Sequence, residues 1–98
     1  MNETLLPLTI RIWRDNSTKD RPYLAYSPDF RVVVAGKDAT LAKNSLLNIV
    51  EDIVTQEEEE GNLDIFLEQI GFSQNKKTSR WEAPEFSFVQ VPLKVGYA

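Results

Sequence analysis

Alternation of apolar and polar residues marks the first third of the chain as strands. Every second residue over 8–13 is a leucine or isoleucine, and this period of two predicts a half-buried strand. Further strands are predicted over 22–27 and 31–35, each preceded by a polar or proline-containing turn. The unbroken valine run 32–34 favours burial on both faces and therefore a central position for the third strand. The three strands are expected to form an antiparallel meander.

The period then changes to that of a helix. Asp38, two residues after Gly36, is a suitable N-cap because its carboxylate can accept from free N–H groups of the first turn. Apolar residues then recur every three or four positions as far as Val54, which predicts one amphipathic helix of about five turns lying on the sheet. The stripe comprises Ala42, Leu46, Ile49, Val50 and Ile53, widened by Leu47 and Val54. A shorter second helix is predicted between Asn62 as its cap and Gly71 beyond its end.

The last quarter of the chain returns to strand character. Residues 72–81 are compatible with either a hairpin or a loop, and a last strand is predicted over 85–95. Its apolar face changes between Phe88 and Val89, which suggests a bulge, and Pro92 restricts it to an edge or to that bulge. The order β-β-β-α-α-β predicts a two-layer α+β fold with one long helix on one face of an antiparallel sheet, in a single domain over 1–98. The other sheet face is expected to meet water or another subunit.

Composition narrows the chemistry. The chain has no histidine and no cysteine, so it lacks the usual general base near neutral pH, any thiolate nucleophile and the usual zinc ligands. A carboxylate-only metal site built from Asp29, Asp38, Glu51 and Asp52 is open in principle. We instead interpret these residues as a turn residue, a cap and a helix surface. We therefore predict no catalytic residue, no metal and no cofactor.

The charge is distributed unevenly. The net charge is 11 − 15 = −4, but residues 44–75 carry eight carboxylates and no lysine or arginine, which leaves 11 − 7 = +4 for the remainder. The eight are Glu51, Asp52, Glu57, Glu58, Glu59, Glu60, Asp64 and Glu68. They form either a solvated helix face or a patch that binds a basic partner. The overall acidity disfavours direct nucleic-acid binding, and the basic residues Lys76, Lys77 and Arg80, beside Phe72 and Trp81, are interpreted as a solvated turn.

The N-terminus predicts the compartment. Glu3 lies where a signal peptide has positive charge, and Arg11 interrupts the apolar stretch. No apolar run approaches the ~20 residues of a membrane span. We expect a cytoplasmic protein that does not cross a membrane.

One stretch carries a family resemblance. The sequence Tyr-Leu-Ala-Tyr-Ser-Pro-Asp-Phe over 23–30 is followed by a glycine and then by a helix with a regular pattern. This arrangement resembles the HicB-like antitoxin family. The residues that carry the motif are Tyr23, Ala25, Pro28, Asp29, Gly36 and Ala42, with Leu46, Val50 and Glu51 continuing it. Arg31-Val32-Val33 replaces the Pro-Gly-Cys of many members, Asp38 the usual threonine and Ser45 the usual asparagine. The C-terminal DNA-binding segment of full-length members is not expected after Ala98.

The resemblance implies a partial RNase H-like fold without nuclease residues, and association as dimers or higher oligomers. It also implies occlusion of a small basic mRNA-interferase toxin. The residues expected to face that toxin are Glu51, Asp52, Glu57, Glu58, Glu59 and Glu60. Two alternatives remain: a solitary homo-oligomeric scaffold or regulator with no toxin, and an enzyme that uses a carboxylate-bound metal.

Overall fold

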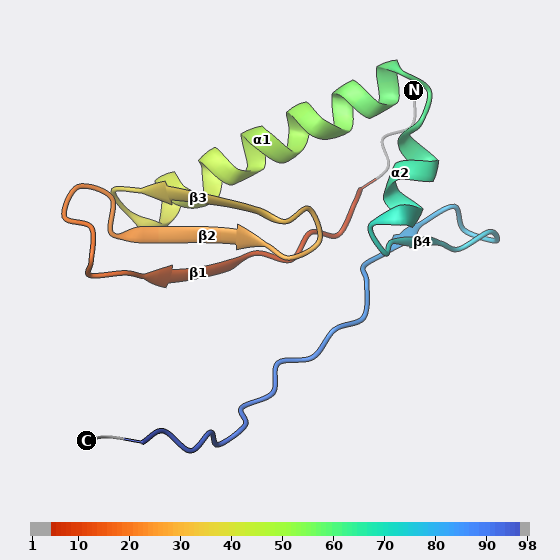
Figure 1. Cartoon of the computed structure of the whole chain (residues 1–98). Coiled ribbons are helices and arrows are strands. Elements are labelled where there is room, and N and C mark those ends of the chain that lie inside the picture. The colour runs from red at the N-terminus through yellow and green to blue at the C-terminus, as the bar shows by residue number, and fades with distance from the viewer. Residues whose placement is uncertain (1–4, 97–98) are drawn as a thin grey trace.

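The chain folds as a sheet and a helix in two layers. The computed structural model describes residues 5–96 and shows a three-stranded antiparallel sheet with a long helix on one face. A short helix and a two-stranded hairpin lie together beyond one end of the sheet (Figure 1). The elements are β1 (Arg11–Arg14), β2 (Tyr23–Ser27), β3 (Val32–Gly36), α1 (Ala39–Glu59), α2 (Leu63–Gln69), β4 (Ser73–Gln74) and β5 (Trp81–Glu82). The α+β prediction is confirmed.

The sheet has the order β1-β2-β3, so β2 is central. The prediction that the valine-rich third strand is central is wrong: β3 is an edge strand, and Val33 is 56% exposed. The small residues Ala25 and Ser27 of β2 are instead completely buried. A central strand covered on only one face thus uses small side chains under the helix, while the valine run fits the pleated surface of an edge.

Helix α1 lies very close to the sheet at its start. Asp38 caps it by accepting a hydrogen bond from the backbone N–H of Leu41 (2.8 Å), as predicted. Ala42 is completely buried, and a Cβ atom added to Gly36 would lie 2.6 Å from the Ala42 backbone nitrogen. Glycine at this position therefore allows the first turn of α1 to approach the end of β3. The first hydrophobic cluster forms there, from Ala25, Ala42, Leu46 and Val50.

A second cluster joins α2 to the hairpin. Leu67, Phe72 and Trp81 form its buried centre. Residues 72–81, for which sequence left two alternatives, include β4 and β5 as an antiparallel hairpin. Phe30, in the turn between β2 and β3, contacts both clusters. Its ring centroid lies 6.0 Å from that of Phe66 and 6.1 Å from that of Phe72, so one side chain connects the two parts of the core.

Both α1 and α2 are followed closely by a glycine. The helix α2 begins after Asn62, whose side chain makes no capping hydrogen bond, and Gly71 beyond its end has a φ of +104°. The predicted glycine terminus of α2 is thus confirmed, because this left-handed conformation favours glycine. Gly61, with a φ of +75°, follows α1 in the same way.

The last predicted element is absent as a strand. Residues 85–96, which we call the C-terminal arm, form no strand or bulge and run in an extended path away from the folded part (Figure 1). A strand needs a neighbour to pair its N–H and C=O groups, and none of the described strands pairs with the arm. The radius of gyration is therefore 16.9 Å, against the ~13 Å of a compact chain of this length.

Candidate functional site

The six carboxylates predicted to face a partner lie at the C-terminal end of α1. All are exposed except Glu57, which is half-buried. With 3.6 residues per turn, Glu51 and Glu58 lie along one flank of the outward half of α1, and Asp52 and Glu59 along the other. We call these four residues the acidic face. It extends about 12 Å along the helix axis, from the rise of 1.5 Å per residue.

Glu57 and Glu60 are placed differently from the acidic face. Glu57 continues the buried stripe of Leu46 and Val50, seven residues after Val50. Its carbonyl accepts a hydrogen bond from the backbone N–H of Asn62 (2.9 Å), at the turn into α2. Glu60 is the C-cap residue. The structure therefore brings four of the six predicted residues onto one surface and separates these two from it.

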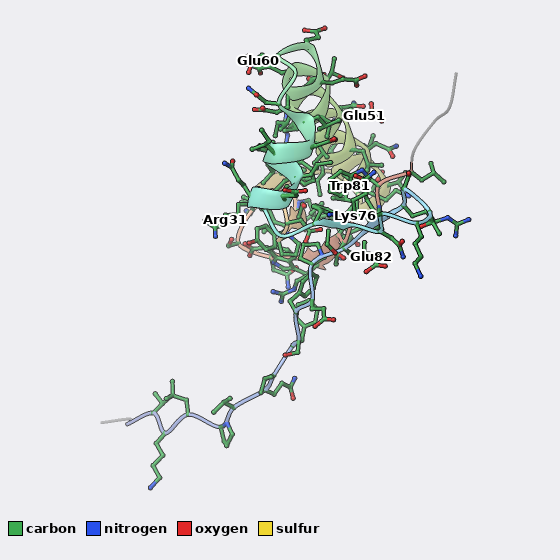
Figure 2. All side chains as sticks on the ribbon, turned by 90° about the vertical axis from the view of Figure 1, so that its right-hand side faces the viewer. Arg31, Glu51, Glu60, Lys76, Trp81 and Glu82 are labelled. Carbon is green, nitrogen blue, oxygen red and sulfur yellow. The ribbon has the colours of Figure 1, made fainter. Side chains whose placement is uncertain are left out.

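The electrostatics of this end of the molecule are uniformly negative. The C-terminus of a helix carries a partial negative charge of roughly half an elementary charge, which adds to that of the carboxylates. The last turn of α1 contains no basic residue. Figure 2 shows Glu60 at one extremity, distant from the labelled Arg31 and Lys76. Lys43 is the last basic residue of α1, so no lysine or arginine of this helix lies beside the carboxylates at its C-terminal end.

The residues of the family motif are packing residues. Ala25, Gly36 and Ala42 are buried where α1 meets the sheet, and Tyr23 packs against the same cluster. Pro28 is half-buried in the turn after β2. In this structure these five residues therefore hold the helix and the sheet close together, and of the residues that continue the motif only Glu51 belongs to the acidic face.

Asp29 has a structural position in the same turn. It is only 6% exposed, and one carboxylate oxygen accepts a hydrogen bond from the backbone N–H of Thr9 (3.3 Å). Burial raises the pKa of Asp29 above its ordinary value, and the Thr9 hydrogen bond partly opposes that rise in pKa. Asp29 thus connects the segment before β1 to the turn between β2 and β3.

The alternative sites have no support in the geometry. Among residues 5–96, no group of three or more carboxylates is arranged to hold a metal ion. Asp38 is occupied as the cap of α1. Phe72 and Trp81 are 2% and 9% exposed in the second cluster, so neither offers a free ring for a nucleic-acid base to stack on.

The open face of the sheet is a surface that sequence reasoning located only in outline. The strand register places two cross-strand rows on the face opposite α1. These rows are Trp13-Leu24-Ala35 and Arg11-Tyr26-Val33. The guanidinium of Arg11 lies 4.7 Å from the centre of the Trp13 ring, a cation–π contact. Alternation along the strands could have identified these residues, but their pairing needed the register.

Comparisons with other proteins leave the family open. Within the described residues, no helix has the length and apolar character needed to cross a membrane. Comparison with known protein families, with characterised proteins and with solved structures finds no match. The HicB-like resemblance therefore rests on the motif residues between Tyr23 and Glu51, and it stays a prediction.

Proposed function

We propose that this protein is a non-catalytic binding module whose acidic face captures a small basic protein. In its most specific form, the proposal is a HicB-type antitoxin that inhibits a basic mRNA-interferase toxin by covering its RNA-binding surface. The observation that carries it is the exposed carboxylate set Glu51, Asp52, Glu58 and Glu59 on the outward half of α1. This surface lies in a stretch of 32 residues, 44–75, without a single basic side chain.

Physical chemistry favours a basic partner for such a surface. Exposed like charges on one helix repel each other, and a cationic partner relieves that repulsion on binding. Complementary charge mainly accelerates encounter and excludes wrong partners, and its range is about 8 Å at physiological ionic strength. Association through the acidic face is therefore expected to slow steeply as salt is added.

The test is capture of a partner with two charge-matched variants. The test variant reverses Glu51, Asp52, Glu58 and Glu59 to lysine. The control reverses four other acidic residues to lysine, all exposed and none on the acidic face. These are Asp20, Glu68, Glu82 and Glu85. Each protein is expressed in the native host and purified, and co-purified proteins are identified by mass spectrometry.

The expected result is one stoichiometric, small, basic protein with the wild type and the control, and its loss with the test variant. The captured protein should cleave mRNA in a cell-free translation reaction, and this chain should suppress the cleavage. Equal capture by the test variant would refute the acidic face as the binding surface. A partner without ribonuclease activity would refute the antitoxin assignment.

A second candidate is a homo-oligomeric scaffold or regulatory domain without a toxin. The exposed apolar side chains of the C-terminal arm favour it, since isolated chains rarely leave so many apolar residues in water. Self-association at micromolar concentration, without capture of any basic protein, would support this candidate over the first.

A further inference from the structure

The C-terminal arm has the character of a strand without a neighbour. Residues 89–95 alternate strictly between apolar and other side chains, as in a strand with one buried face. The apolar set is Val89, Val91, Leu93 and Val95, and each of these is 61–83% exposed. Phe86 and Phe88 lie on the opposite face, with their rings 5.6 Å apart in an edge-to-face contact. The apolar side chains of the arm therefore lie on one face over residues 86–88 and on the opposite face over residues 89–95.

The root of the arm is held by the fold. Ala83 packs against the second cluster. Pro84 lies so close to Gly71 that a Cβ there would be 3.1 Å from the proline Cβ and Cγ atoms. Pro84 also favours extended backbone at the residue before it, Ala83. Within one chain the arm then projects into solvent (Figure 1).

The sheet has an unpaired edge at β1 that an extended segment such as the arm can join. This strand pairs only with β2, so its other edge is free within the described residues. Helix α1 lies chiefly over β2 and β3, which leaves Ile12 38% exposed on the helix side of β1. Trp13 lies on the opposite face of the same strand. The free edge is thus flanked by apolar side chains on both faces, as the arm is.

We propose that the arm of one copy pairs with the free edge of β1 in a second copy, and that two copies exchange arms around a two-fold axis. One chain contains both an unpaired strand and an unpaired edge, and a symmetric dimer satisfies both. The twelve residues 85–96 of an extended chain expose on the order of 2,000 Å². Burying about half of each arm, with a similar area of each receiving sheet, exceeds the ~1,600 Å² of a standard stable interface.

Pro92 determines how the arm can pair. Backbone groups of alternate residues point to opposite edges of a strand, and proline has no N–H to donate. The edge that carries Pro92 therefore faces solvent, and the other edge, with the backbone groups of Val91 and Leu93, meets β1. The arm becomes the outermost strand of the enlarged sheet, so the exchange ends at a dimer and does not continue into a fibre.

The first experiment measures oligomeric state with paired variants of the full chain. Sedimentation across the micromolar range should give a species of twice 11.2 kDa that dissociates on dilution. Val91→Glu places a charge on the apolar face of the arm and is expected to weaken the dimer at least tenfold. Gln90→Glu adds the same charge one residue away and should change the dissociation constant by less than about threefold. Both side chains are exposed in the single chain, so at concentrations where the wild type is monomeric both variants should have its circular dichroism spectrum.

The second experiment distinguishes exchange from closure within one chain. The protein has no cysteine, so single cysteines can be introduced for fluorescent labels at Gly96, near the end of the arm, and at Asn16, in the turn after β1. Mixing donor-labelled Gly96→Cys with acceptor-labelled Asn16→Cys should give energy transfer, and the Val91→Glu change should abolish it. A doubly labelled chain diluted to the monomer should show the same transfer with and without Val91→Glu, because its arm touches no sheet.

Three results would overturn the proposal. One is a monomer throughout the concentration range. Another is a dimer that Val91→Glu and Gln90→Glu weaken equally. The third is transfer in the diluted, doubly labelled chain that Val91→Glu lowers, which would show that each arm folds onto its own sheet. None of these outcomes depends on whether the acidic face binds a basic protein.

Discussion

Replacing Phe30 with alanine should both destabilise the protein and uncouple its two hydrophobic clusters. Phe30 is the side chain that packs against the sheet cluster and also contacts Phe66 and Phe72. A fully buried Phe→Ala change costs ~3–5 kcal/mol, so half-buried Phe30 corresponds to about 2 kcal/mol. Loss of the two tilted ring pairs adds about 1 kcal/mol. The expected total is ~3 kcal/mol, from the ~5–15 kcal/mol that stabilises a domain of this size.

The assay uses Trp81 as the reporter of the second cluster and circular dichroism as the reporter of the whole fold. A Trp13→Phe background leaves Trp81, which lies in the second cluster, as the only tryptophan. In that background, unfolding by urea should give coincident transitions by far-ultraviolet circular dichroism and by fluorescence. With Phe30→Ala added, the fluorescence transition should occur at lower urea than the dichroism transition. The thermal midpoint should fall by about 12–24 °C.

The control for this prediction is Ile65→Ala, which truncates an apolar side chain of α2 that is 59% exposed. It should change the free energy of unfolding by less than about 0.5 kcal/mol, as exposed substitutions usually do. A loss below about 1 kcal/mol for Phe30→Ala would refute the connecting role of Phe30. So would two transitions that stay coincident at a lower midpoint.

Three further predictions concern single positions. Gly36→Ala should destabilise the fold by ~1–3 kcal/mol in urea unfolding, because the new Cβ would lie 2.6 Å from the Ala42 backbone nitrogen. Arg31→Gly should stabilise it by about 0.5–1 kcal/mol, because Arg31 has a φ of +57°, a conformation that costs a side-chain-bearing residue ~1–2 kcal/mol, partly offset by glycine's freedom when unfolded. Asp29→Asn should stabilise the fold at pH 7, because the substitution removes a buried charge while the amide oxygen can still accept the hydrogen bond from the Thr9 N–H.

The pH dependence of the Asp29 effect has a defined sign. Burial raises the pKa of Asp29 in the folded state, so the folded protein binds that proton more tightly than the unfolded chain. The charged carboxylate therefore costs stability at neutral pH, and the wild type recovers that stability as pH falls through the raised pKa. The advantage of Asp29→Asn should shrink over the same interval and vanish below the unfolded pKa. An advantage that stays constant with pH would contradict this account.

Controls for the other two positions use the same measurements. Arg31→Ala keeps a Cβ at the left-handed position and should bring no gain in the free energy of unfolding. An equal gain from Arg31→Ala and Arg31→Gly would show that strain is not the cause. A neutral Gly36→Ala would show that the start of α1 can move away from β3 without loss.

Local patterns predicted most of the elements because each depends on residues close in sequence. The period of two located β1, turn residues and the valine run located β2 and β3, the three- and four-residue spacing located α1, and Asp38 and Gly71 marked helix ends correctly. Position in the sheet could not be derived this way. A valine run satisfies an edge strand with a covered face as well as a central strand, so β3 was misplaced.

Long-range contacts account for the rest. No local pattern shows that Phe30 reaches residues 66 and 72, or that Gly36 faces Ala42. The alternating pattern of the arm was recognised, but a pattern shows that a strand is favourable and does not supply its neighbour. For the candidate site, sequence located the acidic segment. Separating Glu57 from the acidic face required knowing that α1 continues in register through Glu59.

The separation of charge along the chain gives the molecule a permanent electric dipole. The net charge of −4 determines the force on the molecule in an electric field. The contrast between −8 over residues 44–75 and +4 elsewhere determines the torque that orients it. Near a charged object the molecule rotates before contact, so its acidic end leads toward a cation and the remainder leads toward an anion. At low salt, an ion exchanger of either sign can therefore retain this acidic protein, and each would hold it by a different end.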